Sequence, residues 1–306
     1  MAFFHQSLAL TLIIAAISHA QGQNPGRPAS IQVHSDLVLI NALVTDRQGA
    51  VITGLGASAF RLFEGGKQQV VKYCASEDVP VSIGLILDSS GSMSSKLALL
   101  KQAALQFVRA GNPADEYFLI EFRNRPRLVL PLTGDLDQVA QSIADLTAGG
   151  NTALLDALHL AVGEIRHANN PRKALLLISD GLDNHSRYTE RETKRLISEL
   201  DIPIYTINLY ERPSGNRYAI QRQDPGILEA ISTPTGGRSF RELNPKKISS
   251  VAELIASEIR HEYVLGYVPI NRERDGKFRR VRVQAELQVG KSFRISHREG
   301  YYAPVQ

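Results

Sequence analysis

The spacing of apolar and polar positions changes twice along the chain and divides it into three parts. In residues 31–71 apolar and polar side chains alternate in short runs, which glycines and an Asp-Arg-Gln-Gly turn separate. This alternation predicts a small antiparallel β-unit. The same texture returns after residue 262, with strands predicted at residues 263–268, 278–287 and 292–296. A longer part with a different pattern lies between them.

The middle part alternates apolar strands with helical patterns. Runs of apolar residues predict strands at residues 81–87, 117–122, 127–132, 173–179 and 202–209. Apolar positions at helical spacing predict helices at residues 96–110, 136–146, 152–167, 190–200 and 251–262. Alternation sustained over this length favours an α/β fold, in which helices cover both faces of a doubly wound, mostly parallel sheet.

The two β-segments are too small to fold separately. Neither has enough strands to bury two faces, whereas together they supply enough for one small β-sandwich. We therefore predict that residues 31–78 and 263–306 form one sandwich, and that the α/β domain of residues 79–262 is inserted between them in the sequence.

The start of the chain has the composition of an export signal. The first twenty residues carry no Lys, Arg, Asp or Glu, and residues 8–17 are almost purely apolar. Such a stretch is too short to span a bilayer, and Ser18 and Ala20 provide the small residues of a cleavage site. We expect a signal peptide at residues 1–20, a linker at 21–30, and an exported protein that is periplasmic or secreted. Because little positive charge precedes the apolar stretch, an uncleaved N-terminal membrane anchor is the alternative.

Composition and charge exclude several classes of protein. With 43% hydrophobic residues the chain is too apolar to be disordered, and its one cysteine, Cys74, cannot form an internal disulfide. A net charge of +4 is too small for a dedicated nucleic-acid binder. The surplus lies in residues 263–306, which hold nine basic and four acidic residues. These residues form either a solvated strand face or a contact with an anionic envelope polymer or lipid.

Oxygen-bearing side chains mark three junctions between predicted elements. Asp88, Ser90 and Ser92 follow the first α/β strand, Thr152 follows a Gly-Gly-Asn turn, and Asp180 follows the strand at residues 173–179. In an open parallel sheet, ligands bind at the carboxyl ends of strands near a switch in strand order. Two carboxylates and three hydroxyls suit Mg²⁺, with Mn²⁺ or Ca²⁺ as alternatives. Each motif alone is also a common turn or helix cap, so the prediction depends on all three together.

The charge of this ligand set favours an acidic partner. Two aspartates only just neutralise a divalent ion and hydroxyls add no charge, so the metal stays electrophilic towards a carboxylate. An open coordination position would accept an Asp or Glu of another protein. Asp183 and Asn184, just beyond the motif, are interpreted as loop caps rather than as ligands of a second cation.

The three motifs resemble the metal-ion-dependent adhesion site of von Willebrand factor type A domains. Asp88-x-Ser90-x-Ser92, Thr152 in Gly-Gly-Asn-Thr-Ala-Leu-Leu and Asp180 in Leu-Ile-Ser-Asp-Gly match all five of its positions. The resemblance implies a Rossmann-like domain that binds Mg²⁺ and recognises proteins through it, as in cell adhesion. The flanking segments resemble a bacterial subgroup described in Acidobacteria, through Phe60-Arg-Leu-Phe-Glu-Gly-Gly-Lys67 and a chain end near Gly300-Tyr-Tyr-Ala-Pro304.

An enzymatic role is the weaker interpretation. The serines lie in no G-x-S-x-G elbow, and the sequence has no phosphate-binding P-loop. We therefore expect no catalytic residue, no small-molecule substrate and no nucleic-acid partner. Two alternatives to metal-dependent recognition of a protein remain: a structural envelope protein whose metal only orders loops, and a metal-assisted hydrolase, for which Mg²⁺ is a weak activator of water.

Overall fold

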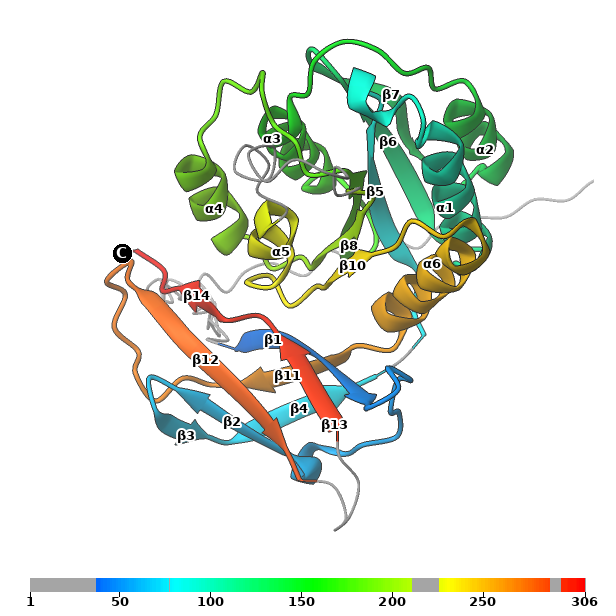
Figure 1. Ribbon diagram of the computed structural model, residues 1–306. Coiled ribbons are helices and arrows are strands. Elements are labelled where there is room, and N and C mark those ends of the chain that lie inside the picture. The colour runs from blue at the N-terminus through cyan, green and yellow to red at the C-terminus, as the bar shows by residue number, and fades with distance from the viewer. Residues whose placement is uncertain (1–36, 77, 211–225, 287–292, 306) are drawn as a thin grey trace, which may run out of the picture. The chain divides into compact units, whose positions relative to one another are not determined.

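The middle part of the chain folds around one six-stranded sheet, shown in the computed structural model of Figure 1. The structure describes residues 37–76, 78–210, 226–286 and 293–305. In spatial order the strands are β10 (Ser239–Arg241), β9 (Ile204–Asn208), β8 (Arg172–Ser179), β5 (Val81–Asp88), β6 (Glu116–Phe122) and β7 (Pro126–Thr133). Neighbouring strands are parallel except β6 and β7, which form an antiparallel hairpin. The predicted α/β fold with a mostly parallel sheet is confirmed.

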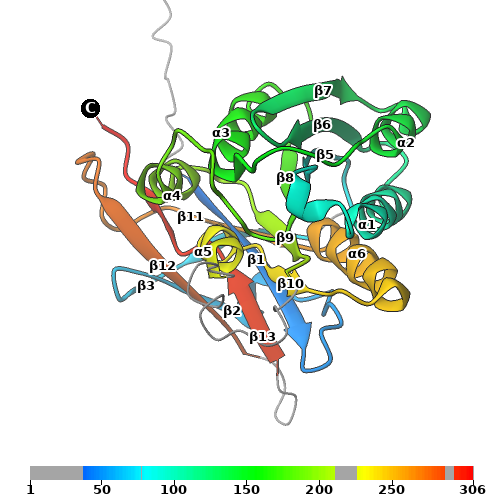
Figure 2. The same cartoon turned by 45° about the horizontal axis from the view of Figure 1, so that its top comes forward.

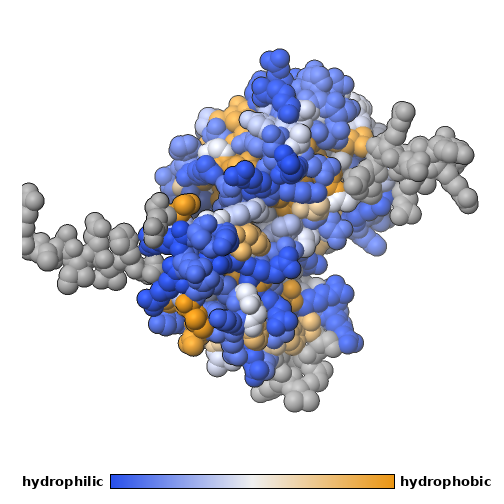
Figure 3. All heavy atoms as spheres, turned by 90° about the vertical axis from the view of Figure 1, so that its left-hand side faces the viewer, coloured by the Kyte–Doolittle hydropathy of each residue, from blue (hydrophilic) through white to orange (hydrophobic). Residues whose placement is uncertain are grey.

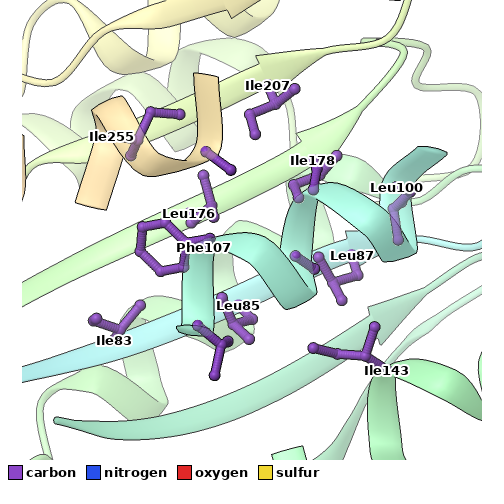
Figure 4. Packing of buried hydrophobic residues seen from close by; sticks show 14 of the residues in the cluster. Ile83, Leu85, Leu87, Leu100, Phe107, Ile143, Leu176, Ile178, Ile207 and Ile255 are labelled. Atoms are coloured by element: carbon purple, nitrogen blue, oxygen red, sulfur yellow. The ribbon is translucent and has the colours of Figure 1, made fainter. Parts of the chain in front are cut away.

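Helices cover both faces of this sheet (Figures 1 and 2). One face carries α1 (Leu97–Arg109), α2 (Leu136–Ala144) and α6 (Pro245–Arg260), and the other carries α3 (Leu154–Ile165), α4 (Glu190–Ser198) and α5 (Gly226–Ser232). Figure 4 shows the first of the two apolar clusters, in which Phe107 of α1 and Ile255 of α6 pack against Leu85 and Leu176 of the strands. Because both faces are covered, β5 is buried along its whole length and reads as a nearly continuous apolar run.

Two parts of the α/β region differ from the prediction. Helix α6 begins at Pro245, well before the predicted start at residue 251. The Asn244 side chain caps it by accepting a hydrogen bond from the Lys246 backbone N–H at 2.9 Å. The Asn-Pro pair is a common helix start, but the polar first turn of α6 hid it from the apolar pattern. The short elements α5 and β10 were not predicted.

The two flanking segments build a sandwich together, as predicted. One sheet has the order β13-β1-β11-β4 and the other β14-β12-β2-β3. The first comprises β13 (Phe293–His297), β1 (Val38–Asp46), β11 (Tyr263–Tyr267) and β4 (Val71–Ala75), and the second β14 (Gly300–Tyr302), β12 (Phe278–Ala285), β2 (Phe60–Glu64) and β3 (Lys67–Gln69). Both sheets combine strands from the two segments, through the β1–β11 and β2–β12 pairs. Their inner faces share a core that includes Ile40, Leu62, Leu265 and Val283.

The surface and the start of the chain bear on the predicted location. The face drawn in Figure 3 is mainly hydrophilic, with apolar residues scattered in small groups. Over the residues that the structure describes, no helix has both the length and the apolar character needed to cross a membrane. The predicted signal peptide at residues 1–20 and linker at residues 21–30 lie outside the described residues.

Candidate functional site

The candidate residues lie where the chain changes direction across the sheet. From β5 the chain continues to β6 and β7 on one side, then returns to β8, β9 and β10 on the other side. Asp88 is the last residue of β5. The strand β8 lies beside β5 and parallel to it, and Asp180 directly follows the last residue of β8. The loops after these two strands leave in opposite directions, which is where open α/β sheets form a binding crevice.

The end of β5 and the loop after it present three of the five candidate oxygen donors. Asp88 Oδ1 accepts a hydrogen bond from the Ser90 backbone N–H at 2.9 Å, and the hydroxyl oxygens of Ser90 and Ser92 lie 3.1 Å apart. A 3₁₀ turn, η2 (Gly91–Met93), follows and is anchored by the fully buried Met93. Asp88 and Ser90 are fully buried, whereas Ser92 is exposed. The donors of this loop therefore extend from the interior to the surface.

Backbone hydrogen bonds join this loop to the one that carries Thr152. The Gly149 N–H donates to the Ser89 carbonyl at 2.8 Å, and the Gly91 N–H donates to the Gly150 carbonyl at 2.9 Å. Gly150 has a φ of +80°, and a Cβ placed there would lie 2.8 Å from the Asn124 side chain. A residue larger than glycine would therefore strain the backbone at this position and press against the turn between β6 and β7.

The loop after β8 is joined to both of the others. The hydroxyl of Ser179, the residue before Asp180, donates to Asp88 Oδ2 at 2.6 Å. The Thr152 N–H donates to the Asn184 side-chain oxygen at 2.9 Å, and the Thr152 carbonyl accepts from the N–H groups of Asn184 and His185. Thr152 is buried. The structure thus brings all three predicted loops together.

Asp183 and Asn184 act as loop caps, as the sequence indicated. Helix α3 begins at Leu154, two residues after Thr152. The Leu154 N–H donates to Asp183 Oδ1 at 2.9 Å, and the Ser186 hydroxyl donates to the same oxygen at 2.6 Å. Asp183 therefore satisfies the first turn of α3, so its carboxylate is already engaged.

Burial changes the electrostatics of Asp88. Burial raises the pKa of the Asp88 carboxyl to about 6, although hydrogen bonds from Ser179 and Ser90 oppose this rise. The neighbouring charge of Asp180 raises the pKa of Asp88 further. A positive charge at this position would relieve both effects, because it favours the ionised form of each carboxyl group.

Lys96 supplies such a positive charge and was missed by the sequence reasoning. Its ammonium Nζ lies 2.7 Å from Asp180 Oδ2, and the two side chains are 14% and 2% exposed. Asp180 Oδ1 accepts a longer hydrogen bond, 3.3 Å, from the Leu182 N–H. Lys96 and Ser179 complete the surroundings of the two carboxylates. A contact between residues 96 and 180 depends on the tertiary fold and leaves no local signal in the sequence.

The residues present fit a hard divalent cation. Two carboxylates and three hydroxyls, from Asp88, Asp180, Ser90, Ser92 and Thr152, are oxygen donors of the type that Mg²⁺ prefers. The Lys96 ammonium shows that Asp180 already holds a cationic group at this position. Within the described ranges no group of three or more His, Cys, Asp or Glu side chains has a metal-binding arrangement. A site with only two carboxylates and with hydroxyls as its other donors is compatible with that result.

These features define a class of protein: a doubly wound α/β domain with oxygen side chains on three loops at its switch point. Residues 83–182 match the family model of the von Willebrand factor type A domain. The chain therefore carries a von Willebrand factor type A domain.

The similarity to known proteins covers a different share of the chain in each case. A solved von Willebrand factor type A protein from Catenulispora acidiphila shares its fold, with a TM-score of 0.52 and 15% identity over 88% of this chain and 73% of that one. An uncharacterized protein of Borreliella burgdorferi is 22% identical over 193 residues, which are 56% of this chain and 55% of that protein. The human von Willebrand factor A domain-containing protein 3B is 28% identical over 162 residues, 51% of this chain and 11% of that protein. The chain thus matches about half of one curated relative and about a tenth of the other. The resemblance to an Acidobacteria subgroup remains a prediction.

Proposed function

We propose that this protein recognises a protein partner through a bound divalent cation, with Mg²⁺ as the first choice. Asp88, Ser90, Ser92, Thr152 and Asp180 would hold the ion, and an acidic side chain of the partner would complete its coordination. The observation that carries the proposal is that the end of β5, the Thr152 loop and the end of β8 meet at the carboxyl ends of the central strands. Hydrogen bonds join each pair of these three segments. When bound, the cation supplies an electrophilic centre for a carboxylate.

The arrangement of the donors favours an external ligand. Asp88, Thr152 and Asp180 are buried or nearly so, while Ser92 at the rim is exposed. An ion held from below by buried groups keeps its outer side towards solvent. A metal whose role was only to order loops would gain by being enclosed on all sides, so this openness favours recognition over a purely structural role.

The surroundings of the site favour an acidic partner. The turn between β6 and β7 contacts the Thr152 loop, since the Ala153 N–H donates to the Arg123 carbonyl at 2.9 Å and the Asn151 N–H to the Asn124 side chain at 2.8 Å. This turn also carries Arg125. Arg125 is exposed and Arg123 partly exposed, and neither pairs with an acidic side chain in the part of the chain that the structure describes. Two such guanidinium groups attract carboxylates.

We propose that the protein has no enzymatic role. We also propose that it lies outside the cytoplasm. A metal-assisted hydrolase would need a general base close to metal-bound water. Asp183 is the nearest further carboxylate in the sequence, and it caps α3 instead. Export is supported by the apolar residues 8–17, which have the length of a signal sequence.

A second contact is proposed on the sandwich. Arg280 and Arg282 of β12 are exposed while Val281 and Val283 are buried, as the alternating sequence predicted. Arg282 lies over the Phe63 ring at 4.8 Å, and the described residues offer neither arginine a salt bridge. We place an anionic envelope polymer or lipid here, and its binding should weaken steeply with salt.

The principal test compares the natural protein with Asp88→Ala. Titration calorimetry should show Mg²⁺ binding to the natural protein and none to the variant. Envelope proteins captured with Mg²⁺ should be released by a chelator and should be absent from the Asp88→Ala sample. If the natural protein binds no divalent cation, or if capture is the same for both proteins, the proposed function is wrong.

A further inference from the structure

Lys96 lies in the candidate metal site, and this position calls for an explanation. Its ammonium nitrogen is 2.7 Å from Asp180 Oδ2, although Asp180 is one of the five proposed ligands. A bound cation and the Lys96 ammonium would require the same carboxylate. This inference rests on the proposed function, because it concerns how the same site takes up its ion.

Each carboxylate oxygen of the site has a hydrogen-bond partner within the chain. Asp88 accepts from the Ser90 N–H with one oxygen and from the Ser179 hydroxyl with the other. Asp180 accepts from the Leu182 N–H and from Lys96. With every carboxylate oxygen engaged, the metal-free site is a stable arrangement rather than a gap in the fold. A metal ion that binds Asp180 Oδ2 would therefore compete with the Lys96 ammonium.

The local position of Lys96 indicates that Asp180 holds it there. Lys96 is the N-cap residue of α1 and makes no side-chain cap for that helix. A cation at a helix N-terminus opposes the helix dipole, and Lys is not a favoured N-cap residue. The helix start therefore gains nothing from this side chain, whereas the charge of Asp180 attracts it.

Lys96 is also able to leave the site. Its ammonium group ends a flexible four-carbon chain and is strongly hydrated when it reaches water. The side chain is 14% exposed, and the adjacent Ser94 and Ser95 are exposed. A rotation about its side-chain bonds would move the charge into solvent without a movement of the backbone.

We propose that Lys96 is an internal counter-cation that a divalent metal has to displace from Asp180, and that it thereby sets the metal concentration at which the site fills. Without metal, Lys96 neutralises Asp180 and stabilises the three loops. With metal, its charge moves into solvent and leaves Asp180 to the ion. Lys96 thus makes the site respond to a higher metal concentration than its ligands alone would require.

The test is the Lys96→Gln variant, which removes the charge and keeps a side chain of similar length. We expect its affinity for Mg²⁺ and Mn²⁺, measured by titration calorimetry, to rise about tenfold, which is about 1.4 kcal/mol. In the presence of a chelator its melting temperature should fall, because Asp180 and Asp88 then lack a compensating charge. A general loss of structure would weaken metal binding as well, so the opposite signs of the two effects identify a counter-cation.

Two further variants keep the test decisive. Lys101→Gln removes a charge from the same helix, at a residue whose ammonium donates to the Ala144 carbonyl, and it should change neither quantity. Lys96→Arg keeps the positive charge. Its metal-free melting temperature should stay near that of the natural protein, and its metal affinity should stay below that of Lys96→Gln. If Lys96→Gln is poorly folded by circular dichroism, Lys96→Met replaces it and should show the same rise in affinity.

The results separate this inference from the proposed function. If the natural protein binds metal and removal of the Lys96 charge leaves the affinity equal or lower, the counter-cation inference is overturned and the proposed function stands. If neither the natural protein nor Lys96→Gln binds metal, both are overturned. If only Lys96→Gln binds metal, Lys96 blocks the site in the natural protein instead of being displaced from it, and both the inference and the proposed function are overturned.

Discussion

Buried carboxylates lie at both ends of the α/β sheet, but their partners differ. At the carboxyl end, Asp88 and Asp180 are held by hydroxyls, backbone N–H groups and one lysine. At the opposite end, near the starts of β8 and β9, the fully buried Glu258 side chain forms an ion pair with Arg238. Beside it, Glu262 accepts a hydrogen bond from the Tyr205 hydroxyl at 3.1 Å.

Under the proposed function, this difference separates a site for binding from a contact that holds the fold. A guanidinium group engages a carboxylate strongly and cannot lose its proton, so the Glu258–Arg238 pair is committed to the fold. Arg172 adds to this end by donating to the carbonyl oxygens of Arg260 and Glu262, at the junction of α6 with β11. Hydroxyls, backbone N–H groups and a single flexible ammonium group leave Asp88 and Asp180 free to exchange partners.

The most direct test of this difference between the two ends removes one carboxylate from each of them. Asp180→Ala should weaken Mg²⁺ binding at least a hundredfold, about 2.7 kcal/mol, because it removes one of only two charged ligands. Glu262→Gln should leave Mg²⁺ binding unchanged. Titration calorimetry on both variants measures the contrast, and similar losses in the two would show that the ends are not functionally distinct.

The opposite end should respond in stability instead. Arg238→Ala leaves the buried Glu258 carboxyl group without its partner, and we expect the free energy of unfolding to fall by about 2 kcal/mol. Urea denaturation measures this change. The double variant Arg238→Met, Glu258→Met removes both charges and should recover most of the loss. An unstable double variant would show that packing, rather than the unpaired charge, causes the effect.

The parts of this picture that the sequence predicts are those that depend on local order. Asp88 and Asp180 could be placed because apolar runs that end in a polar turn locate the carboxyl ends of strands. The strands of the sandwich could be assigned to one unit because neither segment could bury two faces alone. Helix α6 was placed too late because its first turn is polar, and its start at Pro245 depends on an Asn cap.

Contacts between distant residues could not be predicted in this way. Lys96 reaches Asp180 only because β5 and β8 are neighbours in the sheet. Tyr205 and Glu262 meet for a similar reason, at the junction of the α/β domain with the sandwich. In the sequence, Tyr205 looks like an ordinary tyrosine of a strand, and Glu262 looks like an ordinary charged residue at the end of a helix. One sequence gives residue types and spacing, but not which of several lysines or glutamates are brought together by folding.

The pH dependence of stability should separate the two ends further. Burial raises the pKa of Glu262 to about 8, with contributions from the charges of Glu258 and Asp201, which the Tyr205 hydroxyl and Arg172 oppose. A carboxyl group whose folded pKa lies above its unfolded value stabilises the fold at low pH and loses this contribution as pH rises. We expect stability to fall by at least about 1.4 kcal/mol, one unit of pKa, between pH 5 and pH 9.

Glu262→Gln should make this pH profile flatter, because glutamine stays neutral throughout. Urea denaturation at a series of pH values, in the presence of a chelator, measures both proteins without interference from metal. A natural protein whose stability rises over this range would contradict the assignment, and so would a variant with an unchanged slope.

The smallest expected effect tests whether the exposed rim takes part in metal binding. Ser92 and Ser94 lie on and directly after the same 3₁₀ turn, and both are exposed. The Ser92 hydroxyl lies 3.1 Å from that of Ser90, whereas the Ser94 hydroxyl donates to the Gly91 carbonyl at 2.8 Å. Ser92→Ala should weaken Mg²⁺ binding about fivefold, about 1 kcal/mol, through the loss of one neutral ligand. Ser94→Ala should leave it unchanged, since its hydroxyl is engaged with the turn. Equal effects of the two substitutions would mean that the turn conformation matters and the Ser92 oxygen does not, and the ligand set would then shrink to its buried members.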